Sequence, residues 1–162
     1  MRLRRNRDVE GLRPGERLLA KAESTDGGDV VATSRGLRLP GGPEGSEEVE
    51  WSSIESASWD GDDNRLDVRE VPDAAGGRRR HRVALQEPGP LVDIVREQVT
   101  ASVLISRHVP VTGGRGVRVT GRRTADDKIV WSAQLDAGVD VNDPDVREQV
   151  EAAVSQVRNE VE

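Results

Sequence analysis

A change in the spacing of the apolar residues constrains the fold of this chain most strongly. From Pro14 to Gln86, apolar residues recur at every second position in short runs that Gly, Pro, Asp or Asn interrupt. After Pro88 the spacing lengthens to three or four residues, which is the period of a helix. The chain is therefore expected to begin with antiparallel strands and to continue into a helix.

The first part of the chain predicts about six or seven short strands at a spacing of roughly ten residues. Typical alternating pairs are Leu18 with Ala20, Val30 with Ala32, and Leu66 with Val68. Each run has one apolar and one polar face, as in a sheet with one solvated side. Short strands at this spacing predict a small barrel or sandwich.

Two polar segments are expected to be turns between these strands. The step from Thr33 to Gly36 predicts a hairpin turn in which Gly36 takes a positive φ. Residues 60–64, Asp-Gly-Asp-Asp-Asn, predict a second hairpin loop. The acidic spacing of that loop is similar to an EF-hand, but Arg65 and Val71 stand where its glycine and bidentate glutamate would be, so a hairpin is favoured.

The helical spacing predicts a first helix near residues 90–103. Leu91, Val95 and Val99 fall on one side of it, and Pro88 and Pro90 precede it, where proline is tolerated at a helix start. Because this helix follows the strands directly, it is expected to cover the open end or an edge of their sheet.

A hairpin and a second helix are expected to follow. Alternation at Val117 and Val119 and again over residues 129–135 predicts two strands that turn at residues 124–127. Asp143 is a good N-cap and Pro144 suits the first helical position. The helix carries one apolar stripe, made of Val146, Val150, Val154, Val157 and Val161. This stripe could pack on the hairpin of the same chain or on the equivalent surface of a second copy, and the short link over residues 139–142 favours the same chain.

These elements define an α+β fold: a small antiparallel β-barrel or sandwich followed by a helix, then a β-hairpin and a C-terminal amphipathic helix. Three parts are expected along the chain. They are a flexible basic N-terminal arm (1–14), the barrel with its closing helix (15–104) and a ββα lobe packed on it (105–162).

Residues 15–104 resemble the bacterial pleckstrin-homology-like (PH-like) domains. The resemblance is carried by a Thr-x-Arg-x-Leu hairpin and by a hydrophobic-aromatic step, which comprise Thr33, Arg35, Leu37, Trp51, Ile54 and Ala57. The whole chain is also similar to small actinobacterial proteins of uncharacterised function that continue with a helix of the same kind, here marked by Asp143, Pro144, Val146 and Arg147. The resemblance implies a barrel closed by a helix that serves as a binding or scaffold module, without a shared set of catalytic residues.

Charge and composition argue against several classes of protein. A formal net charge of −6 is unsuited to a sequence-specific nucleic-acid binder, because phosphate neutralisation needs a basic surface. The absence of Phe and Tyr makes a base-stacking platform difficult to build, and the absence of Cys excludes disulfides and thiolate metal sites. Without a long apolar run or a secretory segment, a cytoplasmic protein with at most peripheral membrane contact is expected.

Four consecutive residues form the candidate ligand- or partner-binding site. Arg78, Arg79 and Arg80 follow a Gly-containing loop, and His81 comes next. Guanidinium groups bind phosphate or acidic side chains through paired hydrogen bonds. The alternative is a solvated loop whose arginines are balanced by surrounding carboxylates. A further alternative is contact with an anionic membrane through these arginines and the basic N-terminal segment.

Catalysis would depend on the two histidines of the chain, His81 and His108. His81 is expected at a solvated strand end and His108 at a half-buried position, and the Gly-x-Ser-x-Gly elbow of serine hydrolases is absent. The sequence therefore favours a non-catalytic binding or scaffold protein, with no catalytic residue, metal or cofactor. A protein partner and a monomeric or homodimeric state are expected. A hydrolase-type enzyme that uses one histidine is the alternative.

Overall fold

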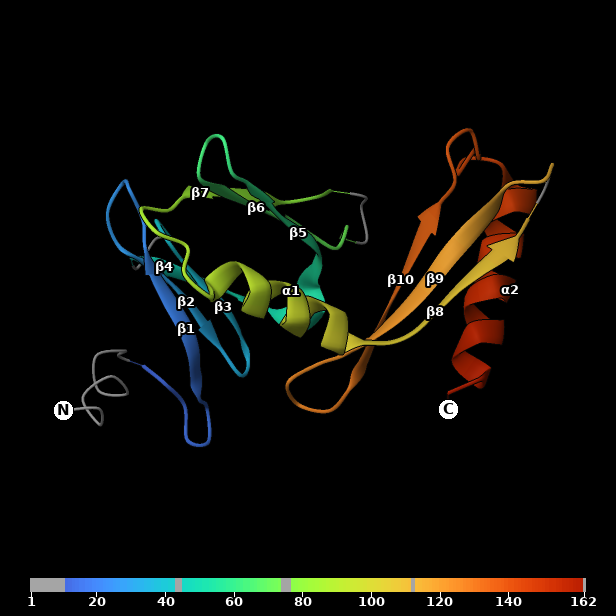
Figure 1. The fold of residues 1–162 in the computed structure, drawn as a ribbon. Helices are drawn as coiled ribbons and strands as arrows, with labels where there is room; N and C mark the ends of the chain where they lie inside the picture. Colours follow the sequence, from blue (N-terminus) through green and yellow to red (C-terminus); the bar gives the residue numbers. More distant parts are fainter. Residues whose placement is uncertain (1–10, 43–44, 74–76, 112, 162) are drawn as a thin grey trace. The chain divides into compact units, whose positions relative to one another are not determined.

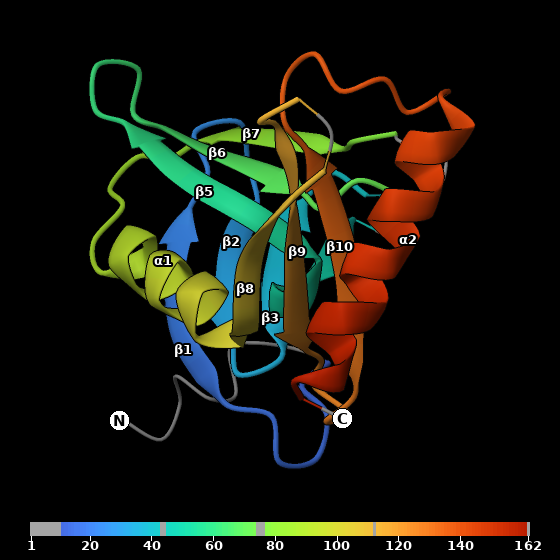
Figure 2. The same ribbon diagram turned by 90° about the vertical axis from the view of Figure 1, so that its right-hand side faces the viewer.

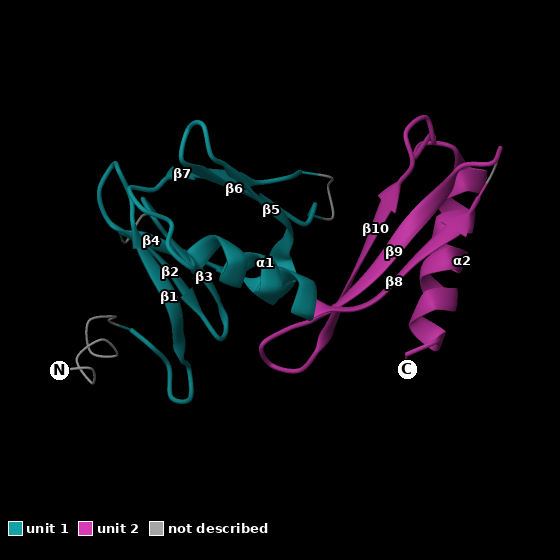
Figure 3. Cartoon of the chain, in the orientation of Figure 1, with its two compact units in different colours: residues 1–101 teal, residues 102–162 magenta. Residues whose placement is uncertain are grey.

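The computed structural model covers the chain and describes residues 11–42, 45–73, 77–111 and 113–161. The chain divides into two compact units, residues 1–101 and residues 102–162 (Figure 3). The basic arm expected over residues 1–14 lies largely outside the described residues, since residues 1–10 are not among them. Over the described residues the fold is α+β, with three antiparallel sheets and two α-helices.

The first unit contains a four-stranded and a three-stranded sheet (Figure 1). The first sheet has the order β1-β2-β3-β4, with strands Leu18–Glu23, Asp29–Thr33, Gly36–Pro40 and Ser46–Glu50. The second has the order β5-β6-β7, with strands Ile54–Asp60, Arg65–Glu70 and Arg80–Ala84. The prediction of mainly antiparallel strands over residues 15–86 is confirmed.

The described strands of this unit form two separate sheets and no closed barrel, so of the expected barrel or sandwich the barrel is corrected. A single 3-10 turn, Trp51–Ser53, stands between β4 and β5 and turns the chain from one sheet into the other. Because this turn replaces ladder hydrogen bonds with a local bond from Ile54 N to Trp51 O, the strand does not run on from β4. An isolated bridge joins Ser24 and Leu85, next to the ends of β1 and β7.

The hairpin between β2 and β3 differs from the expected turn. Gly36 does not have a positive φ, so that prediction was wrong. A Cβ atom at this position would lie 2.4 Å from the carbonyl oxygen of Val49. Glycine is therefore required here by the close approach of β3 to β4, and not by left-handed backbone geometry. By contrast, the hairpin loop at residues 60–64 is confirmed, since Asp60 pairs with Arg65 and Asn64 has φ 51°.

Helix α1, Leu91–Ser102, completes the first unit. Its buried apolar side chains are Leu91, Val92, Val95 and Val99. Leu91, Val95 and Val99 share one core with residues of both sheets, among them Leu37 and Leu66. The prediction of a helix near residues 90–103 is confirmed, and the helix packs against residues of both sheets. No described helix is both long enough and apolar enough to cross a lipid bilayer.

The second unit has three strands where the sequence predicted two. Strands β8 (Val103–Pro110), β9 (Gly116–Arg123) and β10 (Ile129–Leu135) form an antiparallel sheet in the order β10-β9-β8. The expectation of a ββα lobe is corrected to βββα. β8 was missed because it is an edge strand, and Arg107 separates its half-buried residues Ile105 and Val109.

Helix α2, Pro144–Asn159, begins as predicted. The side chain of Asp143 accepts a hydrogen bond from Asp145 N at 2.9 Å, and Pro144 occupies the first turn. The helix lies along the sheet of its own unit (Figure 2), which confirms the predicted packing within the chain. Its buried residues are Val146, Ala153 and Val157, so Ala153 takes the central place expected for Val154.

Candidate functional site

The four residues singled out in the sequence do not form one patch. Arg78 and Arg79 precede β7, whereas Arg80 and His81 are its first two residues. Successive side chains of a strand point to opposite faces of the sheet. The run of three arginines is therefore divided between different surroundings.

Arg78 and Arg79 are engaged with carboxylates of the same unit. Arg78 lies 3.2 Å from the carboxylate of Glu55. Arg79 pairs with Glu47 of β4 and lies 3.7 Å from Glu70. The hydrogen bond from Arg79 holds the pKa of Glu47 below its usual value, although burial opposes the shift. Any external anion must compete with these carboxylates for both arginines.

The two histidines also differ from the expectation. The His81 side chain is only 13% exposed, because it shares a face of β7 with Val83, and its Nε2 lies 2.6 Å from Glu70. A solvated strand end was thus the wrong prediction. His108 is exposed and not half-buried, because it lies on the edge strand β8. Its Nε2 lies 2.9 Å from Asp136.

A different set of arginines lies together on the sheet β5-β6-β7. Arg65, Asp67 and Arg69 occupy every second position of β6 and so share one face. In the register of β6 with β7, Asp67 lies opposite Arg82 and Arg69 lies opposite Arg80. We call this surface the arginine face: Arg65, Arg69, Arg80 and Arg82 around Asp67.

Sequence reasoning found only one member of the arginine face, Arg80. The signal for the others was present, because arginines recur at even spacing at positions 65 and 69 and at positions 80 and 82. Combining that spacing with the pairing of two predicted strands would have placed all four on one surface.

Asp67 is the carboxylate at the centre of this face. Arg80 Nε donates to its two oxygens at 2.9 and 3.1 Å, and a terminal nitrogen of Arg80 donates as well. Arg82 Nε lies 3.8 Å away. The hydrogen bonding from Arg80, followed by the charges of Arg80, Arg82 and Arg69, lowers the pKa of Asp67 despite its partial burial. Asp67 is consequently ionised at neutral pH and orients Arg80.

The arginine face is hollowed. The hollow has a volume of about 440 Å³ and is lined by Ser58, Trp59, Asp60, Arg65, Asp67, Arg69, Arg80 and Arg82. Four guanidinium groups against two aspartates leave a formal excess of two positive charges. The surface is thus electropositive in a chain whose net charge is −6.

Two features of the arginine face are unfavourable for the isolated sheet. Arg69 and Arg80 lie directly opposite each other, and like charges in that position destabilise a sheet. Within the described residues, neither Arg65 nor Arg69 forms an ion pair within 4.0 Å. A bound anion would relieve the repulsion and occupy the donors of these two arginines.

The geometry gives less support to a catalytic site or a metal site than to anion binding at the arginine face. Neither His81 nor His108 lines the hollow of the arginine face. Among the residues that the structure describes, no three His, Asp or Glu side chains gather so that they could hold a metal ion. Comparison of the chain with protein-family models, curated proteins and solved structures finds no match.

Proposed function

We propose that this chain is a non-catalytic binding protein whose N-terminal unit is a PH-like module and whose arginine face binds phosphate groups. The proposal is carried by one observation: four arginines surround a single central aspartate in a hollow on one sheet face. His81 and His108 receive no catalytic role, because the Nε2 atom of each is engaged with a carboxylate outside this hollow.

The order of elements supports the PH-like assignment. Four antiparallel strands, then three antiparallel strands, then a helix that shares a core with both sheets, follow in the order that the resemblance implies. The Thr-x-Arg-x-Leu motif lies in the β2–β3 hairpin, where Thr33 Oγ1 accepts a hydrogen bond from Arg35 N at 3.2 Å. A fold of this kind presents binding surfaces on its sheets and loops without requiring catalytic residues.

The chemistry of the arginine face favours phosphate over a carboxylate ligand. A phosphate group has more acceptor oxygens and more negative charge, so it can accept from Arg65 and Arg69 while Arg80 remains oriented by Asp67. The same chemistry is present in a free phosphate compound and in an anionic lipid headgroup. These two sources differ in whether binding needs a membrane surface.

The test is a titration of the whole chain with inorganic pyrophosphate, and in parallel a sedimentation assay with phosphatidylcholine vesicles with and without phosphatidic acid. We expect pyrophosphate to bind and Arg65→Gln/Arg69→Gln to weaken binding at least tenfold, since hydrogen bonds to charged groups are strong. If the protein sediments with vesicles that contain phosphatidic acid and not with vesicles of phosphatidylcholine alone, the lipid headgroup is identified as the source of the phosphate.

The matched control is Arg17→Gln/Arg96→Gln, which removes two exposed arginines of the same unit away from the hollow. It should leave the affinity for pyrophosphate nearly unchanged. An equal loss in the control would show that only net charge matters, and it would contradict a defined site. Absence of binding at millimolar pyrophosphate and to both kinds of vesicle would also overturn the proposal.

A further inference from the structure

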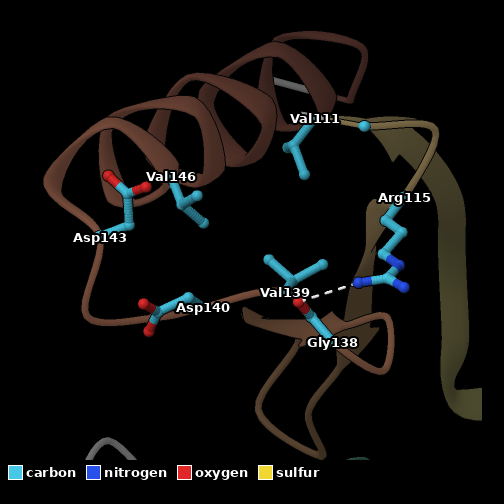
Figure 4. A pocket seen from close by; sticks show the side chains of 8 residues that line it. Val111, Arg115, Gly138, Val139, Asp140, Asp143 and Val146 are labelled. Carbon is cyan, nitrogen blue, oxygen red and sulfur yellow. Dashed lines mark hydrogen bonds between the residues drawn. The ribbon is translucent and has the colours of Figure 1, made fainter.

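A second hollow lies entirely within the second unit, between the start of α2 and the loops at one end of its sheet (Figure 4). Its volume is about 220 Å³. The connection from β8 to β9, the connection from β10 to α2 and the first turn of α2 contribute its walls. This hollow is independent of the arginine face, which belongs to the first unit.

The centre of this hollow is aliphatic. Val111, Val139 and Val146 come from three different segments and point toward one another (Figure 4). Val146 is 7% exposed and forms the floor, whereas Val111 and Val139 are half-buried. Pockets for cofactors and drug-sized ligands run from about 300 to about 1,000 Å³. The smaller volume here therefore suits one short branched aliphatic group.

Charge is distributed unequally around the three valines. Arg115 lies on one side of them, and Asp140 and Asp143 lie on the opposite side with their carboxylates directed away (Figure 4). One oxygen of each aspartate accepts a backbone N–H at 2.9 Å, from Asn142 and Asp145 respectively. The aspartates therefore serve the loop and the helix start, and Arg115 is the charged group that a ligand lying on the valines would meet.

Arg115 is held at this place by its own surroundings. One terminal nitrogen of its guanidinium donates to Gly138 O at 3.1 Å, next to Val139 (Figure 4). A Cβ atom at Gly138 would overlap this nitrogen, so the glycine allows the guanidinium to lie against the loop. Val111 N donates to Arg115 O at 2.8 Å and closes the turn before β9. Among the described residues, Arg115 forms no ion pair within 4.0 Å, which leaves its other N–H groups for a ligand.

We propose that this hollow binds a short branched-chain carboxylic acid, of the size of isovalerate. The carboxylate accepts hydrogen bonds from Arg115, and the branched alkyl group contacts the three valines. A guanidinium group presents its donors in a planar fork that matches the two oxygens of a carboxylate. The acid is ionised at neutral pH and carries its charge at one end only, as the hollow does.

Other ligand classes fit these residues less well. An alcohol of the same shape would offer Arg115 a single neutral acceptor in place of two charged oxygens. A dicarboxylic acid would carry its second charge across the valines toward Asp140 and Asp143, which repel it. An α-amino acid carries its ammonium group beside its carboxylate and would therefore bring it to Arg115. A monocarboxylic acid with a short aliphatic group avoids all three conflicts.

The experiment is a titration of the whole chain with isovalerate, followed by NMR chemical shifts of the backbone amides around residues 113–116 and 138–146. We expect saturable shifts in the millimolar range. The alcohol 3-methylbutanol lacks the carboxylate, so it should bind at least tenfold more weakly. Acetate lacks the branched group and should also bind more weakly. Equal binding of either compound would contradict recognition of both parts of the acid.

Two variants and one control complete the test. Arg115→Gln should weaken isovalerate binding at least tenfold, because it removes the charged partner at an exposed position. Asp140→Asn keeps the acceptor for Asn142 N and should not weaken binding. The control Arg123→Gln removes an exposed arginine that pairs with Asp127 outside the hollow, and it should leave the affinity nearly unchanged. No saturable shifts, an unchanged affinity in Arg115→Gln, or an equal loss in Arg123→Gln would overturn the proposal.

Discussion

The indole nitrogen of Trp51 donates a hydrogen bond to the carbonyl oxygen of Thr33, at 2.9 Å. Trp51 is 5% exposed and stands at the turn where the chain leaves the first sheet and enters the second. Thr33 is the last residue of β2. The bond thus fixes the turn between β4 and β5 to the end of β2, an inner strand of the four-stranded sheet.

Replacing Trp51 by Phe should destabilise the first unit. The substitution keeps an aromatic ring but removes the donor to Thr33 O in a buried place, which costs about 1–3 kcal/mol. Urea denaturation followed by circular dichroism measures this change. Trp131→Phe is the matched control, because the indole nitrogen of Trp131 has no hydrogen-bond partner. If both variants lost the same free energy, the bond to Thr33 would not be the cause.

Gly36 should be intolerant of a side chain. In Gly36→Ala the new Cβ would lie 2.4 Å from Val49 O, so β3 and β4 must separate or shift. We expect a loss of about 1–3 kcal/mol in unfolding free energy, as for overpacking. Gly61→Ala is the control, since its Cβ would meet only Trp59 Nε1 at 3.8 Å and its φ is not positive. Similar melting temperatures for the two variants would contradict this account.

The sequence was sufficient for elements that are defined by local pattern. The period of two, the switch after Pro88, and the Asp143-Pro144 helix start each depend on residues that are neighbours in the chain. What it did not reveal depends on residues that are distant in the chain. The role of Gly36 depends on Val49, and the burial of His81 depends on Glu70 and the core beneath β7.

The arginine face belongs to the same class of features. No single segment contains it, because two of its arginines come from β6 and two from β7. The strand register that brings Arg69 opposite Arg80 could be obtained only after both strands and their pairing were known. The run Arg78–Arg80 is contiguous in the sequence and was therefore predicted as the candidate site, although carboxylates engage Arg78 and Arg79.

Helix α2 should depend on Val157 more than on Val154. Val157 is 1% exposed in the core of the second unit, whereas Val154 is only partly buried at its edge. Valine is a poor helix former, so truncation acts mainly through lost packing. Val157→Ala should cost about 2 kcal/mol and Val154→Ala clearly less, measured by thermal unfolding. The reverse order would show that α2 packs on its sheet through another face.

Glu16 should make the first unit sensitive to acid. The side chain of Glu16 is fully covered, and this burial alone would raise its pKa. Hydrogen bonds from Arg13 N and Thr33 Oγ1, together with the charges of Arg38 and Arg13, act in the opposite direction. They outweigh burial, so the pKa of Glu16 lies below 4.5. A carboxyl group with a lowered pKa in the folded state stabilises the fold above its unfolded pKa. That stabilisation is lost as the pH falls through the folded pKa.

The stability of wild-type protein should therefore fall with pH below 4.5, and Glu16→Gln should reduce the slope of that fall while lowering stability at neutral pH. Urea unfolding at a series of pH values on both sides of 4.5 measures the slope. Glu97→Gln, at an exposed position of α1, is the control. An unchanged slope in Glu16→Gln would show that Glu16 does not link protons to folding.

Asp67→Asn gives the sharpest test of how the arginine face works. Asp67 accepts hydrogen bonds from Arg80 and lies near Arg82, so it competes with any external anion for both arginines. Its replacement by the isosteric amide adds one positive charge to the hollow and releases these donors. Pyrophosphate affinity should rise several-fold, and the gain should shrink when salt rises to about 0.15 M, where screening acts over about 8 Å.

The same change removes the only carboxylate between Arg69, Arg80 and Arg82 on that strand pair, so the melting temperature without ligand should fall and should recover on adding pyrophosphate. A loss of pyrophosphate affinity in Asp67→Asn would mean that orienting Arg80 matters more to binding than freeing it.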